Sequence, residues 1–203
     1  MTQSTRPVRS VLYIPGSKER ALDKARGLPA DAIIFDLEDA VTHDAKADAR
    51  ATLRAELDKG GFGNRMRIVR INGFDTVWGR QDVEAMQGAE IDALLLPKVN
   101  SAYDLQTLAD MIPDVPLWAM METPKAILNA AKIAEWGETP GSRLDCLVIG
   151  ANDLAKDLRL PGPGRAELMP LMMELIVAAR AFGLDIIDAV FNAFRDEEGF
   201  AAE

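Results

Sequence analysis

Two acidic residues, Glu122 and Asp153, follow two apolar segments of strand length. Glu122 comes directly after segment 117–121, and Asp153 comes four residues after segment 144–149. Because the carboxyl ends of parallel strands open on one side of an α/β barrel or sheet, we expect both carboxylates at one mouth. Oxygen ligands without a nearby histidine or thiol suit a hard cation such as Mg²⁺. The pair therefore predicts a magnesium site.

Each of these acids also has a simpler interpretation. Glu122 could cap a helix that the sequence predicts over 125–136, and Asp153 could cap a short turn. Either acid alone fits such a role as well as it fits a metal site. The two together, after neighbouring strands, favour the site.

Further charged residues follow other predicted strands. Arg70 lies near the end of segment 66–71, and Glu38 and Asp39 follow segment 32–37. The planar guanidinium of Arg70 can donate two parallel hydrogen bonds, so we expect it to hold a substrate carboxylate. An ion pair with Glu38 or Asp39 is the alternative, and the two roles can coexist. We expect Glu38 and Asp39 to hold metal-bound waters, and we count all three as candidate catalytic residues.

Three basic residues in predicted loops could bind a large anionic substrate. Lys18, Arg20 and Lys98 are expected on the same face as the acids, where they could meet phosphates, although loop cations are commonly only solvated. His43 is the only histidine and precedes a predicted helix over about 44–59. We interpret it as a solvated residue at the helix start and not as a catalytic base.

The composition is that of a globular protein with an acidic surface. The net charge of −9, from 23 basic and 32 acidic residues, argues against a general nucleic-acid binder. No apolar segment resembles a signal peptide or reaches membrane-spanning length. Cys146 is the only cysteine and lies within an apolar segment, so we predict that it packs in the core of a cytoplasmic protein.

Seven apolar segments of strand length alternate with helix-like segments. This rhythm indicates βα units, in either an open doubly wound sheet or a (β/α)₈ barrel. No Gly-x-Gly-x-x-Gly or Walker loop follows a strand, and charged residues after four strands would converge in a closed barrel. We therefore predict a single (β/α)₈ TIM barrel domain over 1–203. The predicted strands are 8–14, 32–37, 66–71, 93–96, 117–121, 144–149 and 186–191.

An eighth strand is missing from this count. A closed barrel of this type needs eight strands and typically about 250 residues. Only twelve residues follow Phe191, which is too few for a helix and a strand. Unpaired first and seventh strands would leave exposed backbone edges. We therefore expect a C-terminally incomplete barrel, or a neighbouring chain that covers the gap.

Short motifs spread in order over nearly the whole chain resemble the citrate lyase beta-subunit family. The resemblance implies a Mg²⁺-dependent (β/α)₈ barrel that cleaves or forms C–C bonds in citryl-, malyl- or citramalyl-CoA. It implies metal ligands at Glu122 and Asp153, a carboxylate-binding arginine at Arg70, and a homotrimer or hexamer. The motifs are Val11–Gly16, Phe35–Val41, Val69–Asn72, Leu96–Lys98, Met121–Pro124 and Ile149–Leu154.

Two departures from related patterns limit what the resemblance implies. Related hydroxy-keto-acid aldolases carry Glu-His where this chain has Glu38-Asp39, which argues against a free pyruvate aldolase. In some CoA-lyase relatives, a C-terminal extension of a neighbouring subunit supplies a catalytic acid, and nothing here matches it. The general acid/base is therefore unassigned. We predict retro-Claisen cleavage of a CoA thioester, and the rival interpretation is an accessory barrel that binds an acyl carrier without turnover.

Overall fold

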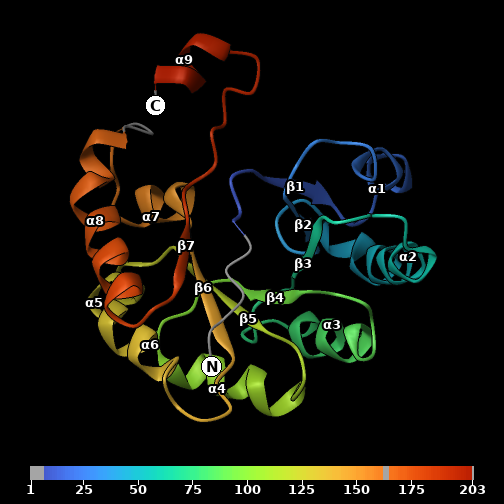
Figure 1. Cartoon of the computed structure of the whole chain (residues 1–203), viewed down its shortest axis with the longest axis horizontal. Helices are drawn as coiled ribbons and strands as arrows, with labels where there is room; N and C mark the ends of the chain where they lie inside the picture. The colour runs from blue at the N-terminus through green and yellow to red at the C-terminus, as the bar shows by residue number, and fades with distance from the viewer. Residues whose placement is uncertain (1–6, 162–164, 203) are drawn as a thin grey trace.

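The computed structural model describes residues 7–161 and 165–202 and contains one curved parallel sheet (Figure 1). The sheet has the strand order β1-β2-β3-β4-β5-β6-β7, and every neighbouring pair is parallel. This confirms the predicted α/β barrel-type fold and its seven strands. The strands are β1 (Val11–Pro15), β2 (Ala32–Asp36), β3 (Met66–Arg70), β4 (Ala93–Leu96), β5 (Leu117–Met121), β6 (Leu144–Ile149) and β7 (Asp185–Ile187).

The sheet is open between its first and last strands. Among the described residues, β1 pairs only with β2 and β7 pairs only with β6. The seven strands thus form a curled, incomplete barrel, in keeping with the predicted lack of an eighth strand. Whether another segment or chain closes the gap stays a prediction.

Helices cover the outer face of the sheet and connect successive strands (Figure 1). None of those in residues 7–161 and 165–202 is both long and apolar enough to cross a membrane. A short 3₁₀ turn (His43–Ala45) precedes α2. The helices are α1 (Glu19–Ala25), α2 (Lys46–Lys59), α3 (Trp78–Met86), α4 (Ala102–Met111), α5 (Pro124–Leu128), α6 (Ala130–Trp136), α7 (Ala151–Asp157), α8 (Arg165–Ala181) and α9 (Glu197–Ala202).

Three predicted elements differ from those observed. The first strand spans Val11–Pro15 and not 8–14. The single helix predicted over 125–136 is two helices, divided at Asn129, whose side-chain amide donates to the backbone oxygen of Asn100. The last strand ends at Ile187, although the apolar sequence continues to Phe191. Phe191 instead lines a cavity beside the sheet, which explains why an apolar sequence leaves the sheet there.

Apolar side chains fill both faces of the sheet. One face packs under the helices, and the other forms a separate cluster inside the curled barrel that includes Trp118 and Cys146. Burial on both faces explains why the central strands are apolar without alternation. Cys146 is 2% exposed, as predicted for a core residue, and burial raises the pKa of its thiol.

A capping box fixes the loop between β4 and α4. The side chain of Asp104 accepts hydrogen bonds from the backbone N–H groups of Asn100, at 2.8 Å, and Ser101, at 2.9 Å. Asn100 in turn accepts a hydrogen bond from the hydroxyl of Thr123, at the end of β5. The box therefore also orients Lys98, which lies in the same loop.

We expect Asp104→Ala to lower the free energy of unfolding by about 1 kcal/mol, because two backbone N–H groups lose their acceptor. Asp110→Ala is the matched control on the same helix, since the exposed carboxylate of Asp110 accepts a hydrogen bond from the exposed side chain of Gln106. The control should stay within about 0.5 kcal/mol of the unmodified protein. Urea unfolding of both variants measures the difference, and equal stabilities would contradict the capping role.

Candidate active site

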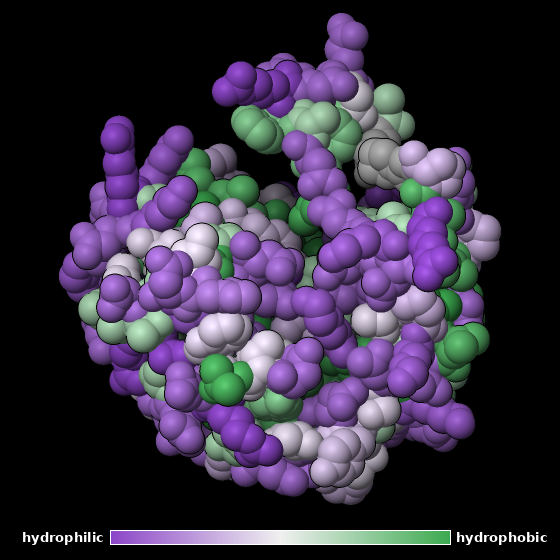
Figure 2. Space-filling model, turned by 180° about the vertical axis from the view of Figure 1, so that it is seen from behind, coloured by the Kyte–Doolittle hydropathy of each residue, from purple (hydrophilic) through white to green (hydrophobic). Residues whose placement is uncertain are grey.

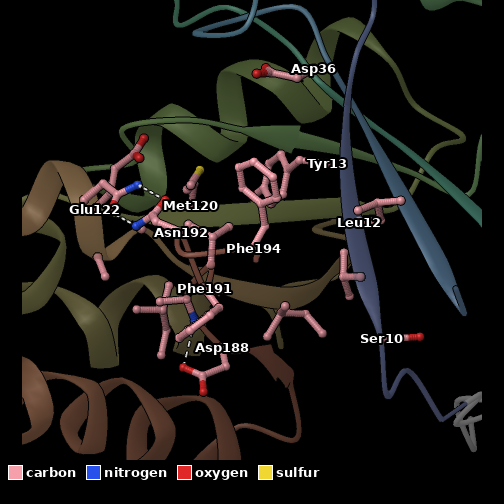
Figure 3. A pocket seen from close by; sticks show the side chains of 18 of the residues that line it. Ser10, Leu12, Tyr13, Asp36, Met120, Glu122, Asp188, Phe191, Asn192 and Phe194 are labelled. Atoms are coloured by element: carbon pink, nitrogen blue, oxygen red, sulfur yellow. Dashed lines mark hydrogen bonds between the residues drawn. The ribbon is translucent and has the colours of Figure 1, made fainter. Parts of the chain in front are cut away.

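A cavity of about 1150 Å³ lies at the open side of the sheet. Its walls come from β1, from the carboxyl ends of β2, β3, β5 and β6, and from the segment after β7. Figure 3 shows Tyr13, Met120 and Glu122 on the strand side, and Phe191 and Phe194 from the segment after β7. Figure 2 shows that the C-terminal segment stands away from the body above a hollow. The site therefore combines buried polar groups with an apolar, accessible wall.

Glu122 is buried at the end of β5, with 2% exposure. Its Oε1 accepts a hydrogen bond from the backbone N–H of Lys98, at 2.8 Å. It does not cap the following helix, because Thr123 is the N-cap of α5 and its Oγ1 accepts from the backbone N–H of Ala126. Burial, together with repulsion from Glu38, raises the pKa of Glu122 to about 7. The carboxylate thus lacks sufficient compensating positive charge.

Gly150 makes room for this carboxylate. A Cβ atom at position 150 would lie 2.3 Å from the Cβ of Glu122 and 2.8 Å from its Oε2. Real Cβ atoms do not approach other atoms so closely, so a larger residue would displace Glu122. The close approach explains a glycine between β6 and α7.

Asp153 lies in the first turn of α7 and is 30% exposed at its side chain. Gly150 occupies the N-cap position of this helix, so Asp153 is not its cap. The Oδ2 of Asp153 is 3.7 Å from the Nζ of Lys98, and the same ammonium group pairs with Glu38. Lys98 therefore contacts Glu122 through its backbone and Asp153 through its side chain. The two predicted metal ligands lie around one residue.

Arg70 makes its main ion pair with Asp36, which is not among the predicted site residues. Its Nε and Nη2 donate to the two carboxylate oxygens of Asp36, at 2.7 and 2.6 Å. The predicted partners, Glu38 and Asp39, lie 3.1 and 3.6 Å from Nη1. The edge that would clamp a substrate carboxylate bidentately is thus occupied by Asp36. Nη1 is the part of Arg70 that could still reach a ligand.

The positions of Asp36 and Arg70 at the ends of adjacent strands could have identified them as partners. Asp36 and Arg70 end adjacent parallel strands, and they are direct partners in the register of β2 and β3. Side chains at such paired positions lie on the same face, so opposite charges there can form an ion pair. The prediction placed the end of the strand beyond Asp36 and considered only the acids that follow it.

The remaining predicted residues divide into near and distant ones. Asp39 lines the cavity with a side chain that is 62% exposed. Lys18 and Arg20 are exposed at the start of α1 and are not among the described residues that line the cavity. His43 stacks on Trp78, with ring centroids 4.8 Å apart, and is likewise outside the described lining.

The donor set fits a hard divalent cation. Five carboxylates surround this mouth, namely Asp36, Glu38, Asp39, Glu122 and Asp153. The cations among the described residues here are fewer, namely Arg70, Lys98 and the buried Lys46, which donates to the backbone oxygen of Glu38. A cation near Glu122 would offset the cost of burying its negative charge and would lower its pKa. No group of three or more His, Cys, Asp or Glu side chains forms a metal-ligand set in the part of the chain that the structure describes. Mg²⁺ needs only one or two carboxylates, with water and substrate oxygens completing its shell.

Comparisons with known proteins show which family the chain resembles. Residues 9–203 match the family model described as HpcH/HpaI aldolase/citrate lyase. A (3S)-malyl-CoA thioesterase of Cereibacter sphaeroides is 57% identical, over 100% of this chain and 70% of the relative. Citrate lyase subunit beta of Escherichia coli is 32% identical, over 99% of this chain and 69% of the relative.

Solved structures of the same kind have a similar fold. A citrate lyase beta subunit of Mycobacterium tuberculosis, complexed with oxaloacetate and magnesium, has a TM-score of 0.79 and 31% identity. The match covers 95% of this chain and 82% of that one. The protein CitE of the same organism, in complex with magnesium, acetoacetate and coenzyme A, has a TM-score of 0.80 and 30% identity, over 95% and 69% of the two chains.

The raised pKa of Glu122 predicts a pH-dependent stability in metal-free buffer. Between the ordinary pKa of 4.5 and about 7, the folded state binds more protons than the unfolded state. The free energy of unfolding should therefore fall as pH rises through this window, by on the order of 2–3 kcal/mol. Glu122→Gln should remove this fall and be more stable than the unmodified protein at pH 8. Urea unfolding at pH 5 and pH 8 tests this, with exposed Glu135→Gln as the control; an unaltered pH dependence in Glu122→Gln would contradict it.

Proposed function

The chain belongs to the HpcH/HpaI aldolase/citrate lyase family, and from this membership we propose a Mg²⁺-dependent enzyme that acts on a malyl-CoA-type thioester. The observation that carries the proposal is the convergence of Glu122 and Asp153 on Lys98, beside a cavity rich in carboxylates. Homologous proteins acting on acyl-CoA esters support the substrate class.

Glu122 and Asp153 would hold the ion in this proposal. Bound Mg²⁺ supplies positive charge that polarises substrate oxygens. Glu38 and Asp39 lie within reach of Arg70 and would orient water molecules and the hydroxy-acid end of the substrate. Arg70 contributes Nη1 while its other donors keep it fixed on Asp36.

The cavity suits a ligand with one polar end and one apolar arm. Its lining includes the charged residues Glu122, Asp153 and Arg70 and, from the segment after β7, the apolar residues Val190 and Phe191. We propose that the hydroxy-acid end of the thioester binds among the charged groups and that the pantetheine arm lies along the apolar wall. Of the three loop cations predicted to bind an anionic substrate, Lys98 lies beside this site, and its side chain is 39% exposed.

Two reactions are compatible with this site. In hydrolysis, water adds to the thioester carbon, the C–S bond breaks, and the thiolate takes up a proton, which gives malate and CoA. In retro-Claisen cleavage, the substrate hydroxyl loses its proton, the C2–C3 bond breaks, and the enolate of acetyl-CoA is protonated as glyoxylate leaves. The identity of 57% to (3S)-malyl-CoA thioesterases, against 29–32% to the lyases, favours hydrolysis as the net reaction.

A product assay tests the proposed function. With (3S)-malyl-CoA and Mg²⁺, we expect equal amounts of malate and free thiol, and no turnover after chelation of the metal. Glyoxylate and acetyl-CoA as the products would establish the lyase reaction instead. Absence of both pairs of products would contradict the proposal and favour an accessory barrel that binds an acyl carrier. Light scattering of the same sample tests the homotrimer or hexamer, which stays a prediction.

Substitution of the two proposed ligands tests the metal site. We expect Glu122→Gln and Asp153→Asn each to weaken Mg²⁺ binding at least tenfold and to lower turnover at limiting Mg²⁺, because each removes one of two carboxylates. Asp157→Asn, an exposed acid one turn further along α7, is the matched control for Asp153→Asn. Calorimetric titration with Mg²⁺ measures the affinities, and unchanged affinity in either variant would overturn the assignment of that residue.

A further inference from the structure

Tyr13 presents a buried hydroxyl group to the candidate site. It lies on β1, lines the cavity, and packs in the interior cluster of the curled barrel (Figure 3). Its hydroxyl oxygen is buried and has no hydrogen-bond partner among the described residues. Burial is the main cause that raises the pKa of this phenol, which therefore keeps its proton.

The position of the Tyr13 ring is tightly determined. The guanidinium of Arg70 lies over the ring, with its central carbon 5.2 Å from the ring centroid. Arg70 is itself held by the two hydrogen bonds to Asp36. These contacts fix the ring, and with it the position of the phenol oxygen, before any ligand arrives.

An unpaired buried hydroxyl is unfavourable for folding. A group of this kind loses its hydrogen bonds to water and gains none from the protein, so it calls for an explanation. Phenylalanine would fill the same space and keep the contact with Arg70 without this cost. A hydroxyl that serves a bound ligand accounts for the tyrosine.

Other donors that line the cavity already have partners within the protein. Arg9 binds the carboxylate of Asp31 with its guanidinium, and the side-chain amides of Asn152 and Asn192 bind each other. The acids of the cavity are acceptors when ionised and cannot stabilise a negative oxygen. Ser10 also lines the cavity, but its hydroxyl accepts from the backbone N–H of Asp31 and it precedes β1, at the end away from the acids. Tyr13 is therefore the hydroxyl of the described lining that is buried and has no hydrogen-bond partner.

We infer that the Tyr13 hydroxyl donates a hydrogen bond to the thioester oxygen of the bound substrate. This inference rests on the proposed function and adds a catalytic residue to it. In hydrolysis, negative charge develops on this oxygen as water adds; in C–C cleavage, it develops as the enolate forms. A donor already fixed in position stabilises either charge without reorganisation.

Tyr13→Phe isolates this hydroxyl. We expect kcat with (3S)-malyl-CoA and Mg²⁺ to fall about 100-fold and KM to change less than threefold, because the hydrogen bond strengthens as charge develops. Tyr103→Phe is the matched control, since Tyr103 is the only other tyrosine and is 77% exposed. The control should retain the kcat and KM of the unmodified protein.

A second measurement separates the ligand role from a structural one. In the absence of ligand, the urea midpoint of Tyr13→Phe should equal or exceed that of the unmodified protein, since no internal hydrogen bond is lost. A variant that is at least as stable but about 100-fold slower supports the inference. A lower midpoint, a kcat within twofold of the unmodified protein, or a loss confined to KM would each overturn it.

The same assays distinguish a failure of the role of Tyr13 from a failure of the proposed function. If the unmodified protein turns over the thioester and Tyr13→Phe is equally active, only the role of Tyr13 fails. If the unmodified protein turns over neither the C–S nor the C–C bond, the proposed function fails and the inference fails with it.

Discussion

The buried ion pair between Arg70 and Asp36 is the interaction on which the candidate site depends. Both side chains are almost fully buried, at 8% and 3% exposure, and they join the ends of β3 and β2. From Arg70 the charges continue to Glu38, from Glu38 to Lys98, and from Lys98 to both proposed metal ligands. Removing one partner of such a pair leaves an uncompensated buried charge, which costs roughly 3–5 kcal/mol. These contacts therefore link the carboxyl ends of five neighbouring strands, β2 to β6.

Much of the fold could be predicted because parallel strands buried on both faces are continuous apolar segments. This pattern located all seven strands, including β4 and β5 with their observed bounds. It could not locate the end of β7, because the apolar residues after Ile187 serve the cavity and not the sheet. It also could not divide the helix at Asn129, since that break depends on a hydrogen bond to the distant Asn100. Tertiary contacts decided both differences.

The candidate site was predictable to the extent that strand ends determine position. Glu122 and Asp153 follow adjacent strands, and the structure brings them together around Lys98. The partner of Arg70 was missed because strand register, and not sequence distance, pairs it with Asp36. The significance of Tyr13 was invisible in the sequence, because an apolar strand with one tyrosine reveals nothing about whether its hydroxyl finds a partner. Such information exists only in the packed structure.

The two candidate reactions make the same electrostatic demand on this site and differ in their need for water. Both place negative charge on the thioester oxygen, but hydrolysis requires water at the thioester carbon, whereas an enolate survives best when water is excluded. Phe194 and Phe200 line the cavity and are 81% and 67% exposed. Hydrolysis therefore needs a wall that leaves water a path to the thioester carbon, whereas C–C cleavage needs a wall that closes over the enolate.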